Sequence, residues 1–261
     1  MLNIVTATFV EAKPIIKYFN LKKKNFVSEF QMFENFQKSI SLIVSGIGKV
    51  NAASAVTYQA LLCNKKKNNI WLNIGIAGGN NKIGELRLIN KVIDNSNKKS
   101  WYPHFCFESE IKKKVCVTFD EPKFIYKNYF NDMELSGFFQ TCLKFSCNEL
   151  IHSIKIVSDN QENKNLLPFK DKISKLINEN LGVIEDVAIK LLIVRSFIMK
   201  DDIIKKQTNL YFKKNKLNKK DKQEIIYLLY LWHIHKKKSI DIKHFSGNEI
   251  LQILRKEIRN D

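Results

Sequence analysis

Residues 69–79 read NIWLNIGIAGG, an apolar run that ends in two adjacent glycines. A short apolar run that stops at a turn signal is typical of a buried strand. Glycines that follow a strand let the backbone approach a ligand closely, although an ordinary glycine turn has the same pattern. The glycine spacing is not GxGxxG, so the stretch does not indicate a dinucleotide site.

On both sides of this strand, segments with the pattern of a strand alternate with segments that have helical periodicity. Residues 46–49 form a tight turn before an alanine-rich helix, and Pro14 is expected in the first turn of another helix, where its missing N–H does little harm. Strands alternating with helices predict an α/β fold with a mixed sheet. The expected strands are 2–8, 28–36, 40–44, 69–76, 85–93, 114–119 and 152–157, and the expected helices are 11–19, 50–63 and 133–145.

From Ile173 onward the sequence shows only helical periodicity. Two capping boxes are predicted, Asp221 with Glu224 and Ser246 with Glu249. Residues 205–220, rich in lysine and asparagine, have the composition of a linker. We therefore expect an α/β domain at 1–204 and a basic helical extension at 205–261.

Composition excludes several classes of protein. The chain has 261 residues and a formal net charge of +18, from 44 basic and 26 acidic side chains. Only four of the basic residues are arginine, the side chain that suits phosphates and bases best, so the charge argues against a nucleic-acid function. No apolar run reaches the ~18 residues of a membrane span, and the N-terminus has no signal-peptide pattern. Five scattered cysteines indicate buried, reduced thiols in a cytoplasmic protein.

Three carboxylates lie next to the expected strands, at the edge where open α/β sheets bind ligands. Glu11 follows the first strand, Glu134 opens a helix, and Asp159 ends the last strand. Each also has a structural interpretation, because an acid near a helix N-terminus complements the helix dipole and an aspartate in a turn caps a helix. Lys155 lies on the last strand in an apolar setting, where a lysine often neutralises a carboxylate in a cleft.

Taken in order, the motifs are Glu11 after a strand, GIGKVNAA at 46–53, NIGIAGG at 73–79, Asp-Met-Glu at 132–134 and Ser-Asp at 158–159. This ordered set resembles the purine nucleoside phosphorylase and uridine phosphorylase superfamily. The chain is most similar to its nucleosidase branch, whose known members hydrolyse methylthioadenosine and S-adenosylhomocysteine. The resemblance covers about residues 2–160. It implies a three-layer sandwich with a central mixed β-sheet flanked by helices, to which this chain adds the C-terminal helical extension.

The resemblance implies that Asp159 is the general acid at N7 of the purine and that Glu11 holds or deprotonates the attacking water. These roles are chemically consistent. Breaking an N-ribosidic bond creates an oxocarbenium-like sugar and a purine that leaves once it is protonated, and burial can keep a carboxylic acid protonated near neutral pH. By analogy with glycoside hydrolysis, we expect the two groups to lie roughly 6.5–9.5 Å apart or somewhat farther.

The same resemblance implies the residues that bind substrate. Glu134 would grip the ribose hydroxyls, and Met133 would pack against the sugar. Aromatic stacking on the base is expected from Phe119 or Phe124. The remaining implied contacts are Ile47 in the pocket wall, Ala77 and Gly78 through their backbone, and Ser158 beside the acid.

Water is favoured over phosphate as the nucleophile. Phosphate needs arginines and hydroxyls around it, and the bacterial phosphorylases carry them where this chain has Asn73 and Ile76. The chain also departs from the nucleosidases, which commonly have a serine at Ile76 and an arginine at Lys155.

Three functions remain open from the sequence. The leading one is a purine nucleosidase, the second is a phosphorylase that uses phosphate, and the third is a binding protein of the same fold that has lost catalysis. The chemistry requires no cofactor and no metal, and no metal-ligand spacing is present. The resemblance suggests a homodimer that acts on a small purine nucleoside.

Overall fold

The computed structural model describes residues 1–24, 29–63, 68–163, 170–235 and 240–259. These residues form two compact units, Met1–Arg195 and Ser196–Asp261. The boundary that we expected after residue 204 lies inside helix α5 (Leu181–Lys214). The predicted linker at 205–220 is wrong in large part, because α5 continues to Lys214 and α6 begins at Lys219.

The described strands form one mixed sheet, as the α/β pattern predicts. The central strands β1, β5 and β10 run parallel, and all of their residues are buried except the half-buried Ile76, which explains why apolar residues recur on both faces of these strands. Residue 28, where the predicted strand 28–36 begins, lies outside the described residues, and the observed strand there is shorter. The strands are β1 (Leu2–Thr6), β2 (Lys22–Lys23), β3 (Gln31–Glu34), β4 (Ile40–Val44), β5 (Ile70–Gly78), β6 (Leu86–Asp94), β7 (Ser100–Trp101), β8 (Lys113–Thr118), β9 (Phe130–Asp132) and β10 (Ile151–Asp159).

Part of the sheet closes on itself. Strand β5 pairs with β10, β10 with β6, β6 with β8, and β8 with β9. The short strand β9 then returns to β5 through the pair Gly78↔Asn131. This closure brings the ends of β5, β9 and β10 together, and with them Gly78, Asp132 and Asp159. The sequence did not predict β9.

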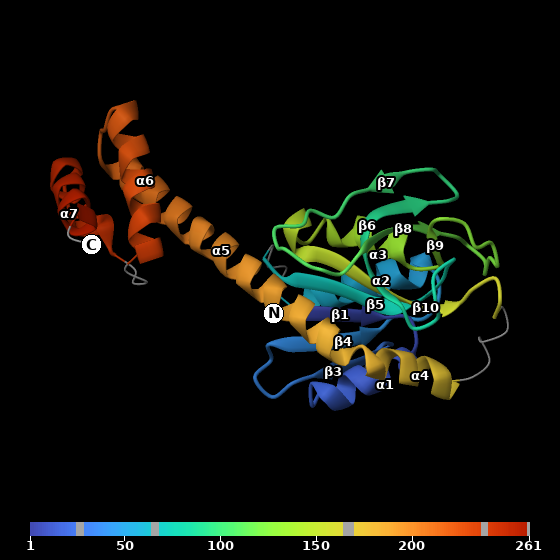
Figure 1. Cartoon of the computed structure of the whole chain (residues 1–261). Coiled ribbons are helices and arrows are strands. Elements are labelled where there is room, and N and C mark those ends of the chain that lie inside the picture. The colour runs from blue at the N-terminus through green and yellow to red at the C-terminus, as the bar shows by residue number, and fades with distance from the viewer. Residues whose placement is uncertain (25–28, 64–67, 164–169, 236–239, 260–261) are drawn as a thin grey trace. The chain divides into compact units, whose positions relative to one another are not determined.

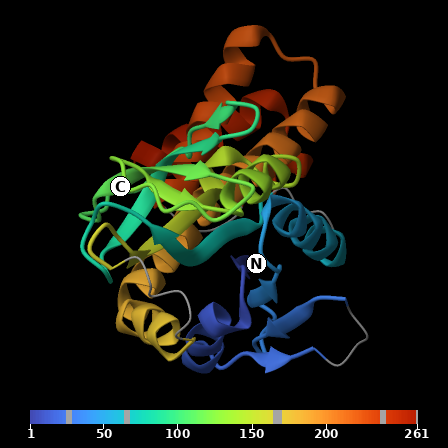
Figure 2. The ribbon, with the colours of Figure 1, turned by 90° about the vertical axis from the view of Figure 1, so that its right-hand side faces the viewer.

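Helices cover both faces of the sheet in the first unit. On one side α1 (Phe9–Tyr18) packs with α4 (Lys170–Glu179), and on the other α2 (Lys49–Leu62) packs with α3 (Leu135–Cys142). Figure 1 shows the two layers below and behind the strands, and Figure 2 shows α1 beside α4 and apart from α2. The expected sandwich of helices around a mixed sheet is confirmed.

Helix α1 begins earlier than the sequence indicated. Thr8 caps it, and the Thr8 and Glu11 side chains bond reciprocally to each other's backbone N–H as a capping box. Pro14 therefore lies inside the helix, and its predicted place in the first turn is wrong. Of the five cysteines, Cys116 and Cys142 are buried as expected, but Cys106 is exposed.

The second unit is helical and has its own apolar core. It contains the end of α5, helix α6 (Lys219–His235), the short 3₁₀ helix η2 (Ile242–His244) and α7 (Gly247–Arg259). The capping box of Ser246 and Glu249 is confirmed, with both reciprocal hydrogen bonds present. The predicted box at Asp221 is wrong, because Asn218 accepts the backbone hydrogen bond from Asp221. No helix in the described ranges is both long and apolar enough to cross a membrane.

Candidate active site

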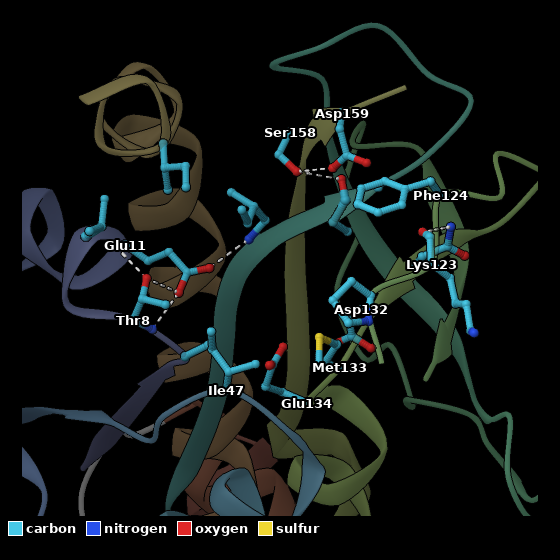
Figure 3. Close-up of a pocket in the computed structure, with 18 residues that line it drawn as sticks. Thr8, Glu11, Ile47, Lys123, Phe124, Asp132, Met133, Glu134, Ser158 and Asp159 are labelled. Carbon is cyan, nitrogen blue, oxygen red and sulfur yellow. Dashed lines mark hydrogen bonds between the residues drawn. The ribbon is translucent and has the colours of Figure 1, made fainter. Parts of the chain in front are cut away.

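A cavity of about 320 Å³ opens in the first unit where the carboxyl ends of β1, β5 and β10 meet the loop after β4 and the segment around β9 (Figure 3). All eight residues to which the resemblance gave a catalytic or binding role line this cavity. Its lining also includes residues that were not proposed for the site, among them Thr8 and Asp132. The eight are Glu11, Ile47, Ala77, Gly78, Met133, Glu134, Ser158 and Asp159.

The Glu11 carboxylate is held by three donors on one side of the cavity. Its Oε2 accepts hydrogen bonds from the Thr8 backbone N–H at 2.8 Å and the Thr8 hydroxyl at 2.9 Å. Its Oε1 accepts one from the Ile76 N–H at 3.0 Å. A Cβ at Gly75 would lie 3.0 Å from Oε1, so the glycine leaves room for the carboxylate. Glu11 thus serves the capping box and also lines the cavity, so its structural and functional interpretations are compatible.

A buried charge cluster forms the floor of the site. The Lys155 ammonium lies 2.8 Å from Asp132 Oδ2, and these side chains are 2% and 0% exposed. Asp132 also accepts hydrogen bonds from the Thr118 hydroxyl and the Leu135 N–H. Burial acts to lower the pKa of Lys155, but the carboxylates of Asp132 and Glu134 outweigh it and raise that pKa. Lys155 is therefore a permanent cation beneath the cavity, as its sequence context indicated.

Glu134 lies close to the same cluster, and its pKa is raised. Its Oε1 accepts a hydrogen bond from the Gly48 N–H at 2.9 Å, which links the loop after β4 to the start of α3. Burial, followed by the negative charge of Asp132, raises the pKa of Glu134 to about 7, against the opposing pull of Lys155. Its carboxyl group can therefore both accept and donate hydrogen bonds near neutral pH.

Asp159 lies at another part of the cavity, where each of its oxygens has one hydroxyl partner. Ser158 donates to Oδ1 at 2.6 Å, and Tyr126 donates to Oδ2 at 2.8 Å. A Cβ at Gly78 would lie 2.9 Å from Oδ2, so the glycine allows β5 to pass directly beside the acid. Burial, followed by the hydrogen bond to Asp159, raises the pKa of the Tyr126 phenol, which therefore remains protonated and a donor.

The segment between β8 and β9 supplies a wall that the sequence analysis left largely unassigned. Phe124 lines the cavity beside Asp159, as Figure 3 shows, whereas Phe119 is buried and is not part of the lining. Ile173 of α4 closes the cavity from the other helical layer. Short polar loops carry little periodic signal, so nothing in the sequence marked Tyr126 as a partner of Asp159.

Among the described residues that line the cavity, one is a lysine, Lys123, and none is an arginine. Among the residues that the structure describes, no three histidine, cysteine, aspartate or glutamate side chains are grouped as metal ligands are. The chemistry available in the cavity is therefore that of carboxyl groups, hydroxyls and backbone amides around an apolar hollow.

No protein-family model matches the sequence, and no curated protein matches it at the level of sequence. Solved structures do match the fold. The 5′-methylthioadenosine/S-adenosylhomocysteine nucleosidase of Helicobacter pylori, solved with an immucillin, has a TM-score of 0.56 and 18% identity, covering 72% of this chain and 97% of that one.

Two further structures are similar to the same extent. Arabidopsis thaliana 5′-methylthioadenosine nucleosidase has a TM-score of 0.56 and 16% identity, over 74% of this chain and 95% of the other. Helicobacter pylori futalosine hydrolase has a TM-score of 0.55 and 17% identity, over 73% and 96%. More than a quarter of this chain extends beyond each match. The sheet and helical layers of this chain thus have the fold of these nucleosidase and hydrolase structures.

Proposed function

We propose that this chain is a purine nucleosidase that uses water to cleave the bond between a purine and ribose. The observation that carries the proposal is the convergence of Glu11, Glu134 and Asp159 on one cavity from three distant segments. Three such carboxyl groups match what the reaction needs: a base for water, an acceptor for the sugar hydroxyls and an acid for the departing purine.

In the proposed mechanism, Asp159 passes its proton to N7 of the purine while the C1′–N9 bond breaks and its electrons move to the base. Glu11 takes a proton from water, whose oxygen bonds to C1′ of the oxocarbenium-like sugar. The products are free base and free ribose moiety, and the proton returns from Glu11 to Asp159 through solvent. The three donors around Glu11 fix its carboxylate in place before the substrate arrives.

Glu134 would accept hydrogen bonds from the ribose hydroxyls, with Met133 against the sugar. Ala77 and Gly78 would meet the base and water, Ser158 would support the acid, and Ile47 would complete the wall. Phe124, rather than Phe119, would stack on the base, because it is the one that lines the cavity.

Water is the proposed nucleophile because acidic groups dominate the described lining of the cavity. That lining includes no arginine, its one lysine is Lys123, and the buried Lys155 is already paired with Asp132. A phosphate dianion would meet four carboxyl groups, those of Glu11, Asp132, Glu134 and Asp159, and too little positive charge. The chemistry of the lining therefore favours hydrolysis over phosphorolysis.

The proposed substrate is an adenine nucleoside with an apolar 5′-thioether, of the methylthioadenosine and S-adenosylhomocysteine type. The apolar lining of Val10, Ile47 and Ile173 suits such a group, and similar structures are nucleosidases of this type. Because the fold is equally similar to that of futalosine hydrolase, futalosine is the alternative substrate to be tested. The resemblance also supports a cytoplasmic location and a homodimer. Analytical ultracentrifugation would test whether the protein is a dimer. Catalysis is assigned to the first unit, since the described residues that line the cavity belong to it.

The test is to incubate the protein with methylthioadenosine, S-adenosylhomocysteine, adenosine, inosine and futalosine, with and without phosphate, and to chromatograph for free base. Base released without phosphate supports the proposal. Release that requires phosphate indicates phosphorolysis. Binding measured by calorimetry with no base released over hours indicates a binding protein, and overturns the proposal.

A further inference from the structure

Tyr126 lies in the irregular segment between β8 and β9, and its half-buried side chain reaches the proposed general acid. Its hydroxyl donates to Asp159 Oδ2 at 2.8 Å, across 33 positions of sequence. The other oxygen of Asp159 is served by its neighbour Ser158 at 2.6 Å. The acid therefore has one hydroxyl partner from its own strand and one from a separate segment of chain.

These two donors matter most when the acid has given up its proton. As the proton moves from Asp159 to the purine, negative charge develops on the carboxylate, and a hydroxyl directed at each oxygen stabilises that charge. A hydrogen bond to a charged group is typically worth about tenfold to a hundredfold in an equilibrium or a rate.

The same segment carries the wall on the base side of the cavity. Phe124, two residues before Tyr126, lines the cavity, and so do Pro122 and Lys123. The Asn131 amide anchors this segment from β9 by donating to the backbone carbonyls of Lys123 and Ile125. The Tyr126–Asp159 hydrogen bond thus ties the wall to the acid, so that the acid and the base-side wall keep one relative geometry.

We propose that Tyr126 is a positioning residue for Asp159, which aims the acid at the purine and stabilises the carboxylate as the proton leaves. This inference rests on the proposed nucleosidase function. It assigns a role to a side chain outside the cavity lining, acting through the acid rather than through the substrate.

The test is Tyr126→Phe, which removes only the hydroxyl. Two substrates separate a role in acid catalysis from a general structural role: the best purine nucleoside of the panel and its 7-methyl derivative. The 7-methyl purine already carries positive charge and leaves as a neutral base without a proton from the enzyme, so it bypasses the acid. Asp159→Asn is the reference for loss of the acid. Tyr129→Phe is the matched control, because Tyr129 is in the same segment and its hydroxyl is not a partner of Asp159.

We expect Tyr126→Phe to lower kcat on the unmodified nucleoside by about tenfold to a hundredfold, with a smaller change in KM. On the 7-methyl nucleoside its rate should stay within about twofold of wild type, as should that of Asp159→Asn. Tyr129→Phe should be near wild type on both. Thermal unfolding of each variant checks that the fold is intact.

Two results would overturn the inference while leaving the nucleosidase function in place. One is a wild-type rate for Tyr126→Phe on the unmodified nucleoside. The other is an equal loss on both substrates, which would mean that the hydroxyl supports the wall and not the acid. A wild-type protein that releases no base from any nucleoside would overturn the proposed function and this inference together.

Discussion

The substitution Glu134→Gln tests how the charge of Glu134 affects the stability of the folded protein. Burial and the charge of Asp132 raise the pKa of Glu134 from its ordinary 4.5 to about 7. The folded protein therefore binds this proton more tightly than the unfolded chain does. As the pH rises from 4.5 to 7, the free energy of unfolding of the wild-type protein therefore falls by about 3 kcal/mol because of this one group. Above pH 7 the loss stays at that level.

Glutamine keeps the shape of the side chain and an acceptor for the Gly48 N–H, but it has no charge to desolvate. We expect Glu134→Gln to be more stable than wild type by up to about 3 kcal/mol at pH 8, and nearly equal to it at pH 4.5. The same variant should bind nucleoside at least about tenfold more weakly at pH 8, because a carboxylate that accepts from the ribose hydroxyls is lost.

The assay is urea unfolding of both proteins at pH 8 and pH 4.5, followed by the KM for base release at pH 8. Glu121→Gln is the control, since the Glu121 side chain is 80% exposed and its replacement should leave stability unchanged at both pH values. A Glu134→Gln protein that is no more stable than wild type at pH 8 would show that burial of Glu134 costs no stability. A difference in stability that does not shrink on acidification would contradict the raised pKa of Glu134.

Three further perturbations test other parts of the structure. Lys155→Met leaves Asp132 buried without its cation and should lower the free energy of unfolding by about 3–5 kcal/mol in urea titrations; wild-type stability would show that the pair is dispensable. Gly78→Ala places a Cβ 2.9 Å from Asp159 Oδ2 and should lower kcat by about tenfold or more with an unchanged circular dichroism spectrum; an unaltered kcat would contradict the tight fit. Ser246→Ala removes the cap of α7 and should destabilise the second unit by about 1 kcal/mol in urea unfolding, whereas an unshifted transition would count against the capping box.

The sequence predicted the architecture of the first unit well because its strands are strongly marked. The runs at 2–6, 40–44, 70–78 and 151–159 are rich in branched apolar residues and are buried on both faces of the sheet, which is the pattern of strands in a sheet covered by helices on both sides. The predicted ends of the helices and strands were less accurate. Helix α1 begins two residues before the predicted start because Thr8 caps it, and the apolar periodicity used for the prediction carries no information about the cap.

The site could be predicted as far as its residues follow ordered motifs. Their places beside strands and helix starts made Glu11, Glu134 and Asp159 candidates, the ordered set of motifs and its resemblance gave them roles, and all three line one cavity. Tyr126 and Asp132 depend on closure of the sheet through β9, a three-residue strand paired with β5 at a single position. That closure is a long-range property of the fold, and no local pattern in the sequence encodes it. The helical character of α5 was predicted, but its last turns, at 205–214, were assigned to a linker, since a composition rich in lysine and asparagine also occurs on an exposed helix.

The account depends most on Asp159 and Glu11 acting as acid and base on the same nucleoside. The most direct measurement is release of free base at saturating nucleoside by wild type, Asp159→Asn and Glu11→Gln, with binding followed by calorimetry. We predict that each substitution lowers the rate by about 10²–10⁴-fold while the nucleoside still binds. A full rate of base release in either variant would contradict the account.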